Sequence, residues 1–92
     1  MPILGKDELR EKLNLLPGWK EEQGEIVRHV QFPDFVAAMH FVNAVAGKAE
    51  AAGHHPDIDI RYNKVRLALV SHDAGGLTQR DFDLAAAIDA LL

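Results

Sequence analysis

Residues 57–70 read DIDIRYNKVRLALV, and they contain two runs in which apolar and polar side chains alternate. Alternation with a period of two is typical of strands that bury one face. Between the runs, Asn63-Lys64 predicts a two-residue turn, because asparagine tolerates positive φ. We therefore predict a β-hairpin with strands over 57–62 and 65–70.

The position of the turn sets which residues face each other across this hairpin. With the turn at Asn63-Lys64, the apolar residues of both strands share one face. Extended past the strand ends, the same register brings His55 opposite His72 and His54 opposite Asp73, as proximity rather than exact pairing, because Pro56 can break the ladder there. The hairpin therefore predicts that histidines from two separate stretches meet at one of its ends.

A short helix and a second hairpin precede this region. An apolar stripe that stops at a Pro-Gly pair predicts a helix over 6–15. Alternation over 26–32 and a turn at Gln23-Gly24 predict a hairpin with strands over 19–23 and 26–32. The first part of the chain therefore has the order helix, strand, strand.

Two further helices complete the pattern. Asp34 is a suitable N-cap for a long helix, and Gly53 is a suitable residue to end it, since glycine adopts positive φ freely. Thr78 with Asp81 three residues later resembles a capping box and predicts the start of the last helix. The order α-β-β-α-β-β-α favours an α+β fold: a single antiparallel four-stranded sheet with three helices packed on one face.

Length and charge narrow the class of protein. The chain has 92 residues, with 10 Lys and Arg against 14 Asp and Glu, a formal net charge of −4. This length suits a single domain over residues 1–92, whose small core makes self-association expected. The acidic balance argues against direct binding of nucleic acid. The absence of cysteine excludes thiolate zinc sites and thiol nucleophiles.

The hydropathy of the sequence predicts neither a membrane-spanning segment nor a secretory signal peptide. No apolar run is long enough to span a bilayer, and the first residues lack the apolar core of a signal peptide. We therefore expect no membrane partner, and a cytoplasmic location follows by default.

The end of the second hairpin gathers side chains suited to proton transfer. His54, His55 and His72 are expected to converge there. Imidazole both donates and accepts protons near neutral pH, so it serves as a general acid or a general base. Three carboxylates are expected nearby, at Glu50, Asp73 and Asp81.

Some of these residues also have purely structural interpretations. Histidine near a helix end commonly interacts with backbone carbonyls. Asp81 is sufficiently explained as part of a cap, and Glu50 as a solvated helix residue. His29 and His40 are interpreted as surface residues without a catalytic role.

Two other kinds of site compete with proton transfer. Two histidines and a carboxylate can hold a metal ion, but His54 and His55 are adjacent and point to opposite sides of an extended backbone. Ser71 next to His72 has the residue types of a nucleophile and its base, but the surrounding residues are not those of a nucleophile elbow. Both alternatives are therefore weaker interpretations of this cluster.

Several short motifs together resemble one enzyme family. They are EAAGHHP at 50–56, YNKV at 62–65, SHD at 71–73, GLT at 76–78 and RD at 80–81. LPGW at 16–19 and FPDF at 32–35 extend the likeness upstream. With these spacings the chain resembles the pterin-4a-carbinolamine dehydratase family over nearly its whole length.

The resemblance implies a reaction and a set of site residues. The reaction is loss of water from 4a-hydroxytetrahydropterin to give quinonoid dihydropterin, which supports tetrahydropterin recycling and needs no metal or organic cofactor. The resemblance also implies a saddle-like α+β fold and a homodimer or homotetramer. The implied catalytic residues are His54, His55 and His72. The implied substrate-binding residues are Glu50, Pro56, Ser71, Asp73 and Asp81.

A second function stays open on the same resemblance. The family also includes a transcriptional coactivator role, in which the fold binds a dimerisation helix of a regulator. An exposed apolar helix face would mark such an interaction module. Phe41 and Val45 lie off the main apolar stripe of the long helix, so they are candidates for that face or for the surface of self-association.

Overall fold

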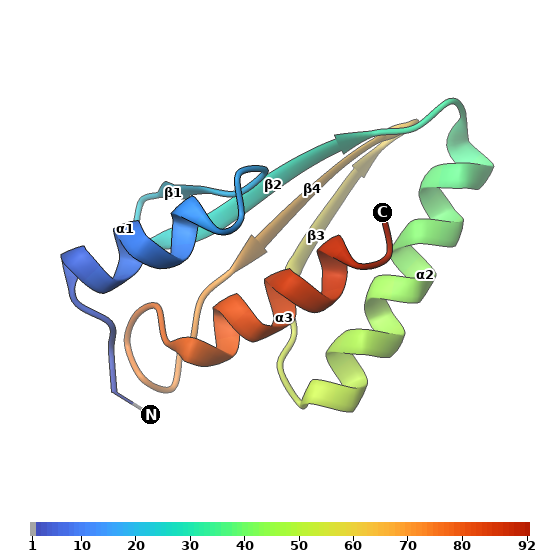
Figure 1. Cartoon of the computed structure of the whole chain (residues 1–92). Coiled ribbons are helices and arrows are strands. Elements are labelled where there is room, and N and C mark those ends of the chain that lie inside the picture. The colour runs from blue at the N-terminus through green and yellow to red at the C-terminus, as the bar shows by residue number, and fades with distance from the viewer. Residues whose placement is uncertain (1) are drawn as a thin grey trace.

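The computed structural model describes residues 2–92. Its elements follow the order α-β-β-α-β-β-α, and the four strands form one antiparallel sheet in the order β1-β2-β4-β3 (Figure 1). The predicted fold class is confirmed. The elements are α1 (Lys6–Asn14), β1 (Lys20–Glu22), β2 (Glu25–Gln31), α2 (Phe35–Ala52), β3 (Asp57–Arg61), β4 (Lys64–Leu69) and α3 (Gln79–Asp89).

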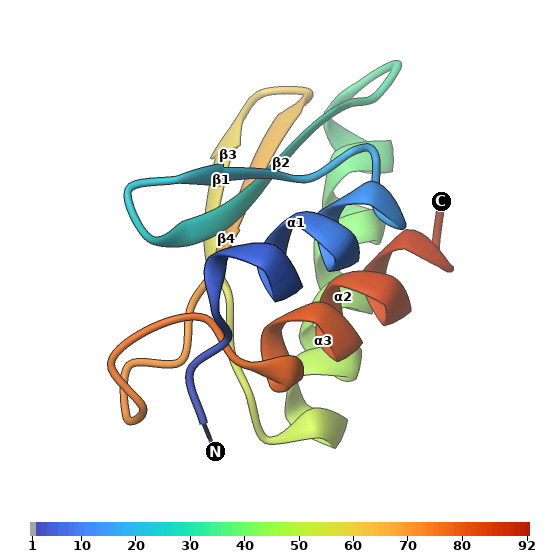
Figure 2. The ribbon, with the colours of Figure 1, turned by 60° about the vertical axis from the view of Figure 1, so that its left-hand side comes forward.

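The sheet has one covered face and one open face. The three helices lie on the same side of the sheet in Figure 1 and again in Figure 2, which turns the view. Ile26 on β2 and Leu67 on β4 belong to the covered face and are fully buried. His29 and Arg66, which pair across β2 and β4, belong to the open face. The alternation in the sequence therefore corresponds to a sheet with one side against helices.

The second hairpin turns one residue earlier than predicted. Arg61 pairs with Lys64, so the turn residues are Tyr62 and Asn63, and the predicted turn at Asn63-Lys64 is wrong. Every partner on β4 consequently shifts by two residues. A shift of two keeps each side chain on its face, because the strand period is two. The apolar pattern alone therefore could not distinguish the two registers.

The histidines lie beyond the end of the β3–β4 ladder. The ladder ends where Asp57 pairs with Ala68, so the chain on both sides leaves the sheet before it reaches a histidine. His55 and His72 are therefore not paired in strand register, which agrees with the expectation of proximity without exact pairing.

Asn63 explains why the turn forms where it does. Its side-chain Nδ2 donates a hydrogen bond to the carbonyl of Phe32 at 2.8 Å, and the Phe32 backbone N–H donates to the Asn63 carbonyl at 2.9 Å. These two bonds attach the turn to the end of β2. Tyr62 takes the left-handed backbone conformation instead, with φ of 53°.

The predicted caps of α2 and α3 are confirmed by hydrogen bonds and backbone angles. Asp34 accepts a bond from the backbone N–H of Ala37 at 2.8 Å. Gly53 ends α2 in the left-handed region with φ of 62°. Asp81 accepts a bond from the backbone N–H of Thr78 at 2.9 Å, which forms the capping box of α3. Within residues 2–92, no helix combines the length and the apolar character needed to cross a bilayer.

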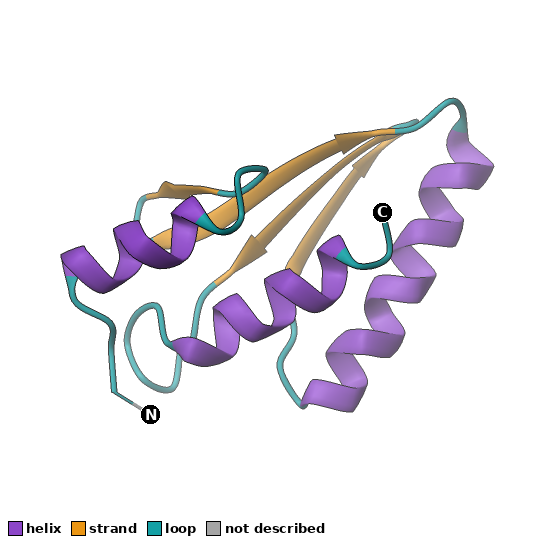
Figure 3. Ribbon diagram, in the orientation of Figure 1, coloured by secondary structure: helices purple, strands orange, loops and turns teal. Residues whose placement is uncertain are grey.

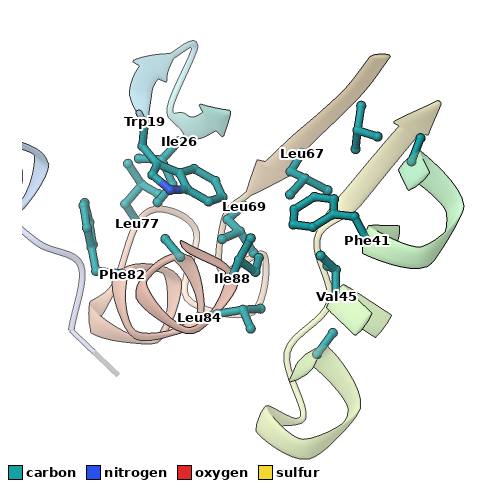
Figure 4. Packing of buried hydrophobic residues seen from close by; sticks show 14 residues of the cluster. Trp19, Ile26, Phe41, Val45, Leu67, Leu69, Leu77, Phe82, Leu84 and Ile88 are labelled. Atoms are coloured by element: carbon teal, nitrogen blue, oxygen red, sulfur yellow. The ribbon is translucent and has the colours of Figure 1, made fainter. Parts of the chain in front are cut away.

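The hydrophobic core fills the space between the sheet and the helices (Figure 4). The buried stripe of α2 is Ala38, Phe41, Val45 and Ala49. Phe41 is only 6% exposed and packs against Phe32, with ring centroids 5.1 Å apart. The prediction that Phe41 and Val45 form an exposed apolar face is therefore wrong. The exposed apolar side chains of α2 are instead those of Phe35 and Val36.

Two connections lie at the same end of the sheet. Residues 53–56 join α2 to β3, and residues 70–78 join β4 to α3; both pass close to the start of α3 (Figure 3). The second connection is compact, because Ser71 and Gly76 form an isolated antiparallel bridge and the Gly75 N–H donates to the Ser71 carbonyl. These two connections carry the three histidines of the predicted site.

Candidate active site

The histidines of the two connections line one surface depression. Its volume is about 320 Å³, and its lining residues are Gly53, His54, His55, Val70, His72, Asp73 and Arg80. The structure therefore brings together four of the residues singled out in the sequence, namely His54, His55, His72 and Asp73. They meet because both connections leave the same end of the sheet, and not through strand pairing.

His54 is the most enclosed of the three histidines. Its side chain is 10% exposed, and its Nε2 lies 2.6 Å from Oδ1 of Asp81, whose side chain is fully buried at the start of α3. The His54 backbone N–H donates to the carbonyl of Ala49 at 3.1 Å, just past the end of α2. The end of one helix and the start of another therefore hold this pair in place.

The carboxylate of Asp81 is surrounded by donors. Ser71 Oγ donates to its Oδ2 at 2.9 Å, and the Thr78 backbone N–H donates to the same oxygen at 2.9 Å. Ser71 Oγ also lies 2.8 Å from Thr78 Oγ1. Since Ser71 gives its proton to Asp81, Thr78 donates to Ser71. Burying a carboxylate without partners costs several kcal/mol, and this network offsets that cost. Ser71 and Asp81 are both fully buried and lie outside the lining of the depression.

His55 faces solvent and pairs with the last full turn of α2. Its Nε2 lies 2.5 Å from Oε2 of Glu50, and both side chains are more than half exposed. An exposed pair of this kind contributes little to stability. Its effect is to orient the ring of His55 at the edge of the depression.

Asp73 and Arg80 form an ion pair in the lining of the same depression. Arg80 Nη2 lies 2.5 Å from Oδ1 of Asp73. The hydrogen bond from this guanidinium, together with its positive charge, holds the pKa of the Asp73 carboxyl below its usual range. Asp73 is therefore an anion at neutral pH.

His72 separates the depression from a neighbouring one. It is exposed, and with Val70 it also borders a hollow of about 340 Å³ between the β1–β2 turn and the Gly75-Gly76 stretch. His72 is therefore open to a ligand from two sides. Pro56 is half-buried and does not line the histidine depression.

A larger depression lies on the open face of the sheet. Its volume is about 530 Å³, and its lining includes His29, Arg61, Lys64 and Arg66. Its lining contains one histidine, three cations, one carboxylate, one amide and two apolar side chains. The smaller depression, with three imidazoles and a held carboxylate network, is the better candidate for acid–base chemistry.

The side chains of the depression suit proton transfer better than metal coordination. Within residues 2–92, no group of three or more His, Cys, Asp and Glu side chains has an arrangement that could hold a metal ion. Two of the three imidazoles are already directed at carboxylates through Nε2.

Arg80 is the lining residue that the sequence interpretation missed. It lies in the first turn of α3, directly before Asp81, and its guanidinium reaches back to Asp73. Its position next to a suspected site residue was the available signal. The backbone at Gly53 and the side chain of Val70 complete the lining and carry no chemical signal in the sequence.

The chain matches a family of known proteins over nearly its whole length. The family described as "Pterin 4 alpha carbinolamine dehydratase" matches residues 2–91. A protein of Acidobacterium capsulatum, provisionally named as a pterin-4-alpha-carbinolamine dehydratase, is 73% identical over 84 residues, which cover 91% of each chain. A protein of Chloroflexus aurantiacus named in the same way is 60% identical over 92 residues, which cover 100% of this chain and 99% of that protein.

Two solved structures resemble this chain. A crystal structure of a transcriptional coactivator/pterin dehydratase from Brucella melitensis matches with a TM-score of 0.93 and 33% identity, covering 97% of both chains. A pterin dehydratase-like protein identified as a RuBisCO assembly factor in the alpha-carboxysome matches with a TM-score of 0.65 and 23% identity, covering 79% of this chain and 84% of that one, which shows the fold alone. From the family match and these identities, the chain belongs to the pterin-4a-carbinolamine dehydratase family.

Proposed function

We propose that this protein dehydrates 4a-hydroxytetrahydropterin to quinonoid dihydropterin and thereby supports tetrahydropterin recycling. The observation that carries the proposal is the single depression lined by His54, His55 and His72 in a chain of this family. The proposed reaction requires proton transfers and nothing else, which is the chemistry that imidazoles supply.

The reaction moves one proton onto the substrate and one proton off it. The bond between C4a and the hydroxyl oxygen breaks, and the oxygen leaves as water after it receives a proton. The N5 lone pair forms the new C=N bond, and the N5 proton is released. A general acid and a general base near opposite faces of the ring each lower the barrier, with typical effects of about 10²–10⁴-fold.

We propose different roles for the three histidines. We assign the two proton transfers to His54 and His72, and the orientation of the pterin ring to His55. Glu50 supports this proposal because it holds the ring of His55. Asp73 belongs to the proposed substrate-binding set because it lines the same depression, and Pro56 belongs to it as the residue that leads into β3.

The first prediction concerns these two histidines. His54→Ala and His72→Ala are each expected to slow the dehydration of freshly generated 4a-hydroxytetrahydropterin by at least about tenfold, because each removes one proton-transfer group. The decay of the carbinolamine absorbance at alkaline pH measures the rate, and circular dichroism checks folding.

The matched control is His29→Ala. His29 is exposed on the open face of the sheet, so its loss should leave the rate unchanged. Folded variants at positions 54 and 72 that both keep the full rate would show that the mechanism is wrong.

The proposal includes an oligomer of one-domain chains that works in the cytoplasm. A domain of 92 residues buries a small core, which favours association with further copies. The apolar side chains of Phe35 and Val36 at the start of α2 are exposed, at 48% and 60%. We propose that a second copy of the chain covers them, in a homodimer or homotetramer.

A second function, as an interaction module, has one specific observation in its favour. The Brucella melitensis relative is described as a transcriptional coactivator/pterin dehydratase. Here the exposed apolar residues at the start of α2 would contact the partner. The histidine variants distinguish the two functions, because they abolish dehydration and leave a contact through α2 unchanged.

A further inference from the structure

The buried network behind His54 offers more hydrogen bonds than a helix cap needs. The cap of α3 is complete when Oδ2 of Asp81 accepts the Thr78 N–H. Ser71 Oγ adds a second donor to this oxygen, and the other oxygen, Oδ1, is directed at Nε2 of His54. Oδ2 of the carboxylate therefore accepts the hydrogen bonds that cap α3, and Oδ1 is free to accept a hydrogen bond from His54.

The network determines which nitrogen of His54 carries a proton. A carboxylate can only accept, so the short contact between Oδ1 and Nε2 requires a proton on Nε2. In the neutral ring, Nδ1 then has the free lone pair. Within residues 2–92, no side chain or backbone group makes a hydrogen bond to Nδ1 of His54. The fully buried side-chain atoms that lack a partner belong to Arg28 and Arg80, so Nδ1 of His54 is accessible.

We propose that Ser71, Thr78 and Asp81 are positioning residues that hold His54 in the Nε2–H tautomer, and that Nδ1 is the nitrogen that exchanges a proton with the substrate. The catalytic part of this inference rests on the proposed dehydratase function, while the tautomer itself does not. Ser71 and Asp81 act through His54, because both are fully buried and lie outside the lining of the depression.

Asp81→Asn tests the proposal, because the amide has the shape of the carboxylate but replaces one accepting oxygen with a donating NH₂ group. The Asn carbonyl oxygen can keep the bonds from Thr78 and Ser71, which places the NH₂ group toward His54. That group donates, so Nε2 must accept, and the proton moves to Nδ1. We expect nitrogen-15 spectra of labelled histidine to show protonated Nε2 in the unmodified protein and protonated Nδ1 in this variant.

Activity should follow the tautomer. We expect the kcat of Asp81→Asn to fall by about 10²-fold with little change in KM, since a misassigned proton removes one proton-transfer step and leaves ring binding intact. Asp83→Asn is the matched control, because it removes one exposed carboxylate from the same helix. It should change neither the His54 spectrum nor kcat.

Ser71 provides a second test that does not depend on the folding of the Asp81 variant. Ser71→Ala removes one donor to Asp81 and should lower kcat by about tenfold while giving a mixture of His54 tautomers. Ser71→Thr keeps the hydroxyl and should restore both the spectrum and the rate. A structural role alone would change the melting temperature without altering the tautomer.

A ligand titration tests which side of His54 is used. His54 also borders a groove of about 370 Å³ between α2 and α3. Addition of 7,8-dihydropterin, a stable pterin, should shift the Nδ1 resonance of His54. An unchanged resonance with bound pterin would overturn the assignment of Nδ1.

Two outcomes of the variant experiments would also overturn the proposal: a proton on Nδ1 in the unmodified protein, or full kcat in a variant with the reversed tautomer. If the tautomer is as proposed and the protein does not dehydrate the carbinolamine, the proposed function fails and the positioning network stands.

Discussion

At the scale of single residues, the Asp73–Arg80 pair shows how the site fixes its charges. The hydrogen bond from Arg80 lowers the pKa of Asp73, so the folded protein binds this proton less readily than the unfolded chain does. The stabilisation from the pair is therefore complete above the unfolded pKa, and it is lost as the pH falls below about 4. At neutral pH the pair places one anion and one cation in the lining of the depression, beside the three imidazoles.

Replacing Arg80 should release Asp73 from this influence. In Arg80→Gln we expect the pKa of Asp73 to rise toward its usual range, because the charged donor is gone. A carbon-13 titration of the Asp73 carboxyl measures it. Lys64→Gln removes a cation from the far end of β4 and serves as the control. An Asp73 titration curve that does not change in Arg80→Gln would contradict the stated cause.

At the scale of elements, the β3–β4 hairpin depends on one side chain in its turn. Asn63 Nδ2 donates to the Phe32 carbonyl, and this bond joins the turn to the strand beside it. The turn residue next to Asn63, Tyr62, has an unfavourable positive φ for a bulky side chain. Tertiary contacts of the turn therefore outweigh the local preference of the chain.

Loss of this contact should weaken the hairpin. We expect Asn63→Ala to lower the free energy of unfolding by about 0.5–1.5 kcal/mol, because a half-buried carbonyl loses its side-chain donor. Urea denaturation followed by circular dichroism measures the change. Gln31→Ala removes an exposed amide from β2 and should cost less. Equal stability of Asn63→Ala and the unmodified protein would show that the side-chain bond is not what sets the turn.

At the scale of the whole molecule, the start of α2 is the surface that we propose for contact with another copy. Phe35 and Val36 are large apolar residues that the fold leaves exposed beside each other. A small domain gains most from covering such residues, since its own core is limited. This surface is separate from the histidine depression, which lies at the other end of α2.

A charge in this surface should dissociate the oligomer. We expect the unmodified protein to sediment at a multiple of 10.2 kDa and Val36→Asp to sediment nearer to 10.2 kDa, because burying a carboxylate at an interface is costly. Leu15→Asp is the control, since Leu15 is also apolar and exposed but lies at the end of α1. A monomeric unmodified protein would show that the expected self-association is wrong.

Local rules in the sequence predicted the order of the elements, the helix caps and the proximity of three histidines. The order of helices and strands and the caps at Asp34, Gly53 and Thr78 depend on neighbouring residues, so a sequence pattern contains them. The grouping of His54, His55 and His72 was also expected, although the strand register used to derive it was wrong by two residues.

What the sequence determined by itself about this protein is therefore its periodicity, its helix ends and the chemistry of its side chains. Only the tertiary structure decided the hairpin register, the burial of Phe41, the reach of Arg80 to Asp73, and which nitrogen of His54 faces Asp81. The physical reason is the separation along the chain over which each interaction acts. Capping and alternation act between residues close in the chain, whereas register, burial and hydrogen bonding to Asp81 depend on contacts between segments that meet only after the sheet and helices pack together.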